Sequence, residues 1–397
     1  MTRKRQTYNY NKRQSKKGRK GKKRLVEFLV ALFALVLILC AYAGKISPQS
    51  FFLAPFLTLA YMPMLLLAGV LLVACLICRR WIGALLLLIA AVVTLPVFSL
   101  YVPLNSEDNL PPMPVDASQQ LKVMTYNVLG FNYNDPVPVG KPSTSVKVIL
   151  EADPDVVLLQ EGMASGLVWD EIPSVQPYVA QVMARYPYTY DSPEGLNIFS
   201  KYPFTTQALS EPRHTRAVLG YNRETTAYLA RAYDLQLPSG KQVRLIDFRL
   251  QSYHLSFGKN QKIRISPDVK PSPLERMKRS FVLRGNDAAT IRLAIDASPA
   301  NVIVCGDMND VVTSHVYRTI RGDDMIDAWA EVGNGYAYTF NRHHLPFRID
   351  HILYRGALQA LQTQRIKDGS SDHYPLLATF DIGVEAEHNQ ESNNSNH

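Results

Sequence analysis

Three long apolar runs without charged side chains lie near the start of the chain, at residues 28–44, 46–78 and 81–104. Each is long enough for a helix that crosses a bilayer, for which roughly 17–25 apolar residues suffice. A basic start followed by one apolar run is also the pattern of a signal peptide, but two further runs favour a membrane anchor. No ionisable residue lies within a run, so nothing indicates a transporter or channel. The pattern therefore predicts three transmembrane helices within residues 25–104.

Strand-like and helix-like segments alternate after residue 120. Strands are expected at residues 121–128, 155–160, 195–200, 301–309, 347–354 and 376–382, with a hairpin at 226–249 that turns at Pro238-Ser239-Gly240, and helices are expected at 145–152 and 273–297. The polar, Pro-bearing stretch at 105–120 is typical of a linker, and residues 385–397 are typical of a disordered tail. This alternation predicts one layered α/β domain at residues 121–384.

Charge is distributed unevenly around the formal total of +9. Residues 1–24 hold twelve Lys or Arg and no acid, so they are expected to form a disordered basic tail, and +9 less 12 leaves −3 for the remainder. Residues 25–104 contribute +2, which leaves −5 from residue 105 onward. The net charge of the α/β domain therefore gives no support for steering toward polyanions, and nucleic-acid binding through the tail is the weaker alternative.

The Lys/Arg asymmetry predicts the orientation of the spans. The basic tail and the Arg79-Arg80 pair are expected at cytoplasmic ends, because the connection between the first two spans offers only Lys45. Three spans then place the α/β domain on the periplasmic or extracellular side of the cytoplasmic (inner) membrane. The four cysteines, Cys40, Cys75, Cys78 and Cys305, show no spacing typical of a disulfide or a metal site.

Polar residues follow several of the predicted strands. The apolar run V-I-V-C ends in a glycine followed by Asp307 and Asn309, the run V-V-L-L-Q ends at Glu161, and a later loop contains Asp372 and His373. Strand ends over a packed core are where rigid catalytic groups are usually mounted. Each one alone is equally explained by a cap, a turn or a surface charge. Their order along the chain carries more information than any single one.

That order resembles the endonuclease/exonuclease/phosphatase superfamily, which has the deoxyribonuclease I-like fold. The matching motifs are T-Y-N-V at 125–128, Q-E at 160–161, G-L-N-I-F-S-K-Y-P at 195–203, G-D-M-N at 306–309, R-I-D-H-I at 348–352 and S-D-H-Y-P at 371–375. With its N-terminal spans, the chain looks like a membrane-anchored bacterial member. The resemblance implies a four-layered α/β sandwich, here preceded by three transmembrane helices, and a divalent-cation site at the shared edge of two sheets.

The resemblance also implies a role for each matching residue. Glu161, Asp372 and Asn127 would hold Mg²⁺, or Mn²⁺ in its place, through the hard oxygen donors that such ions prefer. Asn127 would also bind the substrate phosphate. The catalytic set would be Asp307, which activates or orients the attacking water, Asn309 at the phosphate, and His373, whose ring Asp350 would orient. Whether Asp307 or His373 carries the key proton stays open, and His351 is expected to be structural because it points to the opposite strand face.

One position departs from the family pattern. Where members commonly show Asn-x-His-Leu, this chain has Asp247-Phe248-Arg249-Leu250. Arg249 is permanently charged and cannot act as an acid or base, but it can clamp a phosphate at two points. Asp247, on the same strand face, is expected to pair with it, and His254 is too distant to replace the missing histidine.

The expected function is a membrane-anchored, divalent-metal-dependent hydrolase of phosphodiester or phosphomonoester bonds. Nucleic acid, a phospholipid head group or a small phosphoester would be the substrate, and the lipid bilayer the other partner; no protein partner is inferable. The tether and the acidic domain favour lipid-linked or small substrates over DNA. The alternative is a catalytically impaired binding module of the same fold, which Arg249 favours because it replaces the usual histidine.

Overall fold

The computed structural model describes residues 2–106, 110–114, 116–132, 142–163, 167–209, 213–216, 224–227, 230–252, 272–341, 346–367 and 371–384. The predicted tail at 385–397, His254 and part of the predicted linker lie outside these residues.

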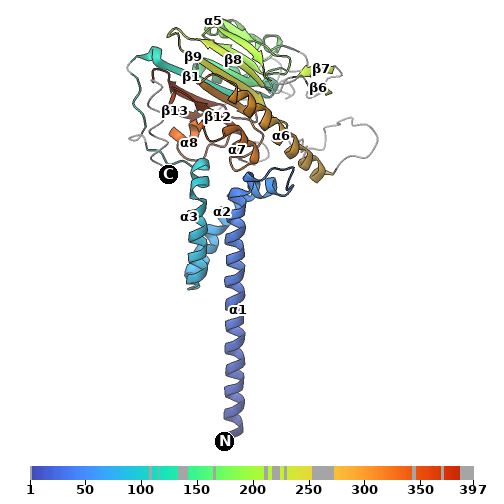
Figure 1. Ribbon diagram of the computed structural model, residues 1–397, viewed down its shortest axis with the longest axis vertical. Helices are drawn as coiled ribbons and strands as arrows, with labels where there is room; N and C mark the ends of the chain where they lie inside the picture. Colours follow the sequence, from blue (N-terminus) through green and yellow to red (C-terminus); the bar gives the residue numbers. More distant parts are fainter. Residues whose placement is uncertain are drawn as a thin grey trace.

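The three predicted membrane spans are helices α1 (Thr2–Tyr42), α2 (Ala54–Ile77) and α3 (Trp81–Tyr101), which lie below the α/β domain in Figure 1. All three are long and apolar enough to cross a membrane. Their shared interior buries Leu37, Tyr61 and Ala90 completely, whereas the outward side chains of Leu66 and Val92 are 71% and 69% exposed. Large apolar side chains on the outside of a bundle are expected where lipid surrounds it.

Two boundaries differ from the prediction. Helix α1 runs through the basic residues that were expected to be disordered, because an apolar span nucleates the helix and Lys, Arg and Gln extend it readily. The second span begins at Ala54 rather than at residue 46. The intervening residues, including the short helix η1 (Ala43–Lys45), instead pack against the α/β domain: the His315 Nδ1 lies 3.2 Å from the Gly44 carbonyl oxygen.

Two six-stranded mixed sheets form the centre of the α/β domain. In order across the first sheet, the strands are β13 (Gln359–Arg365), β14 (Leu376–Asp381), β1 (Gln120–Asn127), β2 (Val156–Gln160), β4 (Asn197–Ser200) and β3 (Tyr188–Tyr190). Across the second they are β11 (Ile326–Asp327), β12 (Asp350–Arg355), β10 (Val302–Asp307), β9 (Gln242–Arg249), β8 (Ala230–Gln236) and β5 (Phe204–Ala208). A separate hairpin pairs β6 (Arg213–Arg216) with β7 (Glu224–Ala227).

The alternation of side chains along these strands builds the layers. Val123 and Leu158 of the first sheet pack against Leu245 and Ile303 of the second, in a core between the sheets. The intervening residues of each strand face outward. The first sheet is covered by α4 (Thr144–Ala152) and α5 (Val179–Arg185), and the second by α6 (Pro273–Asp296) and α7 (His315–Arg321); α8 (Ala328–Val332) packs into the core between the sheets. The predicted four-layered α/β sandwich is confirmed.

The outer core of the second sheet continues without interruption into the membrane helices. The Tyr101 hydroxyl lies 2.8 Å from Thr313 Oγ1, which itself donates to the Thr58 carbonyl at 3.0 Å. Arg348 donates to the Leu100 carbonyl at 3.0 Å, and Asn105, at the start of the predicted linker, donates to the Gly333 carbonyl at 2.8 Å. The α/β domain is therefore packed directly onto the ends of its spans.

Candidate active site

Strand alternation brings most of the predicted site residues to one face and one edge. Asn127 ends β1 on the side that faces the second sheet, as do Val123 and Leu121 before it. In the second sheet, Asp307 pairs in register with Arg249 on one side and Asp350 on the other. These three residues share the inward face with Ile303 and Leu245. The two sheets thus present their polar ends to each other at a common edge.

Glu161 reaches the same edge through an unusual backbone conformation. As the residue after Gln160, it would alternate to the outer face of the first sheet together with Leu159. Its φ of +53° interrupts the strand, and its carboxylate instead accepts a hydrogen bond from Asn127 Nδ2 at 3.0 Å. Asn309 also has a positive φ, of +48°. Left-handed conformations at non-glycine residues are often concentrated at functional sites.

Gly306 allows the two strands of the site to approach. Its φ is +149°, and a Cβ atom there would lie 2.1 Å from the Phe248 carbonyl oxygen, which no side chain tolerates. The glycine of the G-D-M-N motif is therefore a steric requirement of the packing between β9 and β10.

Asn127 connects the two sheets. Its Nδ2 also donates to Asp307 Oδ2 at 3.1 Å, and its Oδ1 accepts from the Leu129 N–H at 3.2 Å. Only the NH₂ group can donate to two carboxylates, so the orientation of the amide follows from its partners. Asn127 therefore positions Glu161 and Asp307. Its predicted contact with a metal or a phosphate stays a prediction, because an amide oxygen that accepts one hydrogen bond keeps a second lone pair.

Asn309 holds Asp307 in the same way. Its backbone N–H donates to Asp307 Oδ1 and its Nδ2 to Asp307 Oδ2, both at 2.8 Å, and Nδ2 also donates to the Leu250 carbonyl at 2.9 Å. Burial raises the pKa of Asp307, and the negative charge of Asp350 raises it further, so that the pKa reaches about 7 although His373 and Arg249 oppose the shift. A carboxylate with a pKa near neutrality is suited to accept a proton.

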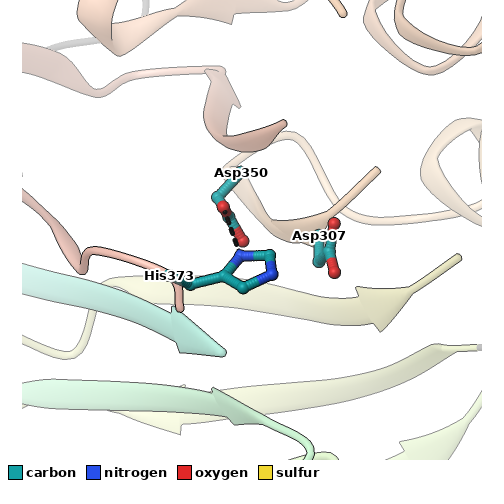
Figure 2. A group of neighbouring side chains, drawn as sticks. All are labelled: Asp307, Asp350 and His373. Carbon is teal, nitrogen blue, oxygen red and sulfur yellow. Dashed lines mark hydrogen bonds and ion pairs between the residues drawn. The ribbon is translucent and has the colours of Figure 1, made fainter. Parts of the chain in front are cut away.

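His373 and Asp350 form a buried pair beside Asp307. The His373 Nδ1 lies 2.9 Å from Asp350 Oδ2, and Figure 2 shows the second ring nitrogen on the side of Asp307. Burial alone would lower the pKa of His373, but the negative charges of Asp350, Asp307 and Asp372 and the hydrogen bond to Asp350 raise the pKa to about 10. The ring is therefore an imidazolium at neutral pH and can donate from Nε2.

The loop that carries His373 is fixed to the first sheet. Ser371 Oγ donates to the Asn127 carbonyl at 2.6 Å and accepts from the His373 N–H at 3.1 Å. Sequence reasoning did not identify this role for Ser371. Asp372 lies within the same loop, close enough for its charge to raise the pKa of His373.

Arg249 pairs with Glu161. Its NH2 lies 2.6 Å from Glu161 Oε1, with the two side chains 20% and 12% exposed. Burial would raise the pKa of Glu161, but the charge of Arg249 and the hydrogen bond from Asn127 lower it below its usual value, so the carboxylate is anionic. Arg249 is thus held by Glu161 and remains partly exposed.

The predicted pairing of Asp247 with Arg249 is wrong. Asp247 is fully buried, and its Oδ1 accepts a hydrogen bond from Gln160 Nε2 at 2.6 Å. Burial raises the pKa of Asp247 well above its usual range, and its hydrogen bond to Gln160 joins the two sheets. His351 lies on the outer face as expected, with its Nδ1 3.9 Å from Asp327 Oδ2.

Two groups of residues at this edge offer ligand atoms for a divalent cation. One ligand atom each of Asp307, Asp350 and His373 lie within 4.8 Å of one another, so these three residues form one group that could hold an ion, with the imidazole neutral when it is a ligand. Glu161 is anionic, partly exposed and next to the loop of Asp372, and one or two carboxylates with water and phosphate oxygens are the donor set that Mg²⁺ uses. The chemistry at Glu161 therefore fits such an ion, with Arg249 as the competing cation.

Comparisons with known proteins agree with the fold. The profile of the endonuclease/exonuclease/phosphatase family matches residues 124–373, and a domain of unknown function matches residues 23–101. No curated protein matches. Similar solved structures include the human Nocturnin catalytic domain with bound sulfate, at 18% identity over 67% of this chain and 96% of that one, with a TM-score of 0.43.

The matches to two further solved structures cover nearly all of the matched chains. They are D. rerio TDP2 complexed with a single-strand DNA product (17% identity, 67% of this chain, 99% of that chain, TM-score 0.43) and a Bacteroides thetaiotaomicron mannosyl-6-phosphatase (14%, 66%, 99%, 0.40). The family profile includes every predicted site residue, from Asn127 to His373. The chain therefore belongs to the endonuclease/exonuclease/phosphatase family.

Proposed function

We propose that this protein is a membrane-anchored phosphoesterase that depends on a divalent metal, Mg²⁺ or Mn²⁺, and hydrolyses phosphodiester or phosphomonoester bonds. The observation that carries the proposal is the convergence of three groups at one edge. They are the anionic carboxylate of Glu161, the carboxylate of Asp307 with a pKa of about 7, and the imidazolium of His373. The two N–H groups of Asn127 join the two carboxylates. Such a set matches the needs of phosphoryl transfer, which are positioning and charge stabilisation.

In this proposal, each group has one task. Asp307 accepts a proton from the attacking water as the new phosphorus–oxygen bond forms. His373, held by Asp350, donates from Nε2 to the departing oxygen as the old bond breaks. Arg249 leaves Glu161 for the phosphoryl oxygens, and Asn127 and Asn309 keep the two carboxylates in place. A metal ion held by Glu161 and Asp372 would neutralise charge on the phosphate.

We also propose that the domain acts on the periplasmic or extracellular side. The connection between α1 and α2 packs against the α/β domain, so the two lie on one side of the membrane. The basic tail and Arg79-Arg80 then lie on the other side, where the positive-inside rule places the cytoplasm. A tethered domain favours substrates within or near the bilayer, either a phospholipid head group or a small phosphoester, over nucleic acid.

The test uses the full chain purified in detergent, because the spans pack onto the domain. A panel of phosphomonoesters, phospholipids and nucleic acids is assayed with Mg²⁺ and with Mn²⁺. Glu161→Gln and His373→Gln should each abolish turnover, whereas Lys147→Ala, on the exposed face of α4, should not change it. Substrate binding without turnover in the unmodified chain would favour the impaired binding module instead.

A further inference from the structure

Helix α6 lies along the connection between the first two membrane spans. The rings of Phe56 and Phe281 meet edge to face with centroids 5.2 Å apart, and Lys278 Nζ lies 5.1 Å from the centre of the Phe52 ring. One to two turns further along α6, Asn286 accepts a hydrogen bond from Gln49. Gly285, where a Cβ would lie 3.7 Å from Pro48, follows Lys278 and Phe281 at the spacing of one helix face, so α6 rests lengthwise on residues 48–56.

This contact places the first turns of α6 at the surface of the membrane. Phe56 belongs to the first turn of α2, which begins at Ala54 and is a predicted span of 24 residues. A helix of that length measures about 36 Å, against about 30 Å of hydrocarbon, so its ends reach the headgroup layer. Figure 1 shows the N-terminal end of α6 beside the α1–α2 connection, whereas its C-terminal end lies farther from the spans.

Side chains exposed here are those of a membrane interface. Phe51, Phe52 and Leu53 are 42%, 40% and 43% exposed, and Leu274 in the first turn of α6 is 56% exposed. The cations Lys278 and Arg279 are exposed nearby and Arg276 is half-buried. The one acid of this segment, Glu275, accepts the Ser272 N–H as part of the helix cap. Aromatic and apolar residues mixed with Lys and Arg are the composition that anchors proteins at the headgroup level.

We propose that residues 46–53 and 274–279, here named the α6 platform, bind the headgroups of anionic phospholipids in the leaflet that the spans enter. Lys278 and Arg279 would pair with headgroup phosphates, while Phe51 and Leu274 enter the acyl boundary. The occupant is lipid, not a protein or nucleic acid, because the platform is continuous with the end of a transmembrane helix.

The platform also has a direct connection to the active site. Farther along α6, buried Arg284 donates to the Gln251 carbonyl at 2.9 Å and pairs with Asp310 at 3.3 Å. Gln251 follows Arg249 and Leu250, and Asp310 follows Asn309. Headgroups that bind α6 would therefore also stabilise the two loops of the site, because Arg284 of the same helix contacts both loops.

Depth-dependent fluorescence quenching tests the membrane contact. The full chain carrying Leu274→Trp is reconstituted in nanodiscs with brominated lipids, and the quenching of the unmodified chain, with its own tryptophans, is subtracted. Quenching is expected at position 274. The control Leu293→Trp lies at the other end of α6, where Leu293 is 70% exposed, and should show none. Equal quenching at both positions, or none at 274, overturns the proposal.

A second measurement tests the lipid class. Quenching of Leu274→Trp is followed as the fraction of brominated phosphatidylglycerol in a phosphatidylcholine nanodisc rises. Removing each cation should raise the fraction needed for half-maximal quenching by roughly fivefold. Lys278→Gln and Arg279→Gln should therefore act in this direction, and Lys147→Gln on α4 should not. Two results exclude anionic headgroups as the ligand. One is quenching that is identical when brominated phosphatidylcholine replaces brominated phosphatidylglycerol, and the other is a half-maximal fraction that is unchanged in both platform variants. Circular dichroism confirms that each variant is folded.

Discussion

At the scale of single residues, Arg249 distinguishes this site from the family pattern. A histidine there could exchange a proton, whereas a guanidinium contributes only a fixed charge and a planar set of donors. In the structure it neutralises Glu161, the carboxylate best suited to hold a metal. In the proposed mechanism the proton chemistry is therefore assigned to Asp307 and His373. The pKa of both is raised, to about 7 for Asp307, which suits a base, and to about 10 for His373, which suits an acid.

Substitution of Arg249 should separate phosphate binding from catalysis. Loss of a hydrogen bond to a charged group corresponds to about 1.5–3 kcal/mol, so Arg249→Ala should lower kcat/KM by about 10- to 100-fold, mainly through KM. The kcat/KM of Arg249→Lys should fall between those of Arg249→Ala and the unmodified chain, because lysine keeps the charge but lacks the planar pair of N–H donors. Steady-state kinetics on the full chain provide the measurement. A gain in turnover for Arg249→His would contradict the proposal and support the impaired binding module.

The pH dependence of kcat/KM should be bell-shaped. Asp307 must be deprotonated to accept a proton, so the rate should rise as pH increases through about 7. His373 must be protonated to donate, so the rate should fall as pH increases through about 10. Because the two groups interact, the profile reports apparent values of the pair. A rate that does not change between about pH 6 and about pH 8 would remove Asp307 from the role of base.

At the scale of elements, the period-two alternation of four strands assembles most of the site. It brings Asn127, Asp247, Arg249, Asp307 and Asp350 to inward faces, and only Glu161 needs an interruption of the strand to join them. Strand β12 is in turn joined to the membrane helices. Arg348, just before it, is fully buried, pairs with Asp327 at 2.7 Å and donates to the Leu100 carbonyl at the end of α3.

Removal of Arg348 should destabilise the domain strongly. Burial would raise the pKa of Asp327, but Arg348 and His351 hold it well below its usual range, so Arg348→Ala leaves a charge buried without its partner. Breaking such a pair lowers the free energy of unfolding by about 3–5 kcal/mol. The control Arg355→Ala, at the other end of β12, removes a more exposed pair with Asp324 and should have a smaller effect. Thermal denaturation of both variants gives the measurement. Equal decreases in Tm would contradict the prediction that the buried Arg348–Asp327 pair contributes more to stability than the Arg355–Asp324 pair.

At the scale of the whole molecule, the α/β domain and three spans form one packed unit. Hydrogen bonds from Tyr101, Thr313 and Arg348 join the ends of the spans to the loop after Asn309 and to the start of β12. The edge that carries the candidate site therefore keeps a fixed orientation relative to the three helices. A free tether would not confer this property.

A topology reporter tests the orientation of this unit. Alkaline phosphatase fused after residue 384 should be active, because three spans place this position outside the cytoplasm, and a fusion after Arg80 should be inactive. Replacing the Lys and Arg residues of 3–24 with Gln should lower the activity of the first fusion by mixing orientations. The nucleic-acid alternative predicts instead that this change abolishes DNA binding by the full chain and leaves the topology unaltered.

The sequence by itself determined the spans, most strands, the layered class and the motif residues, because hydrophobic periodicity and chain order are local properties. The tertiary structure decided how the polar groups pair. Arg249 meets Glu161 and not Asp247, and Asn127 and Asn309 position carboxylates with N–H groups that are already engaged. It also decided that the second span begins at Ala54 and that α6 rests on the residues around the start of this span. These contacts join residues far apart in the chain, and their geometry depends on the packing of two sheets and three helices, which no local pattern contains.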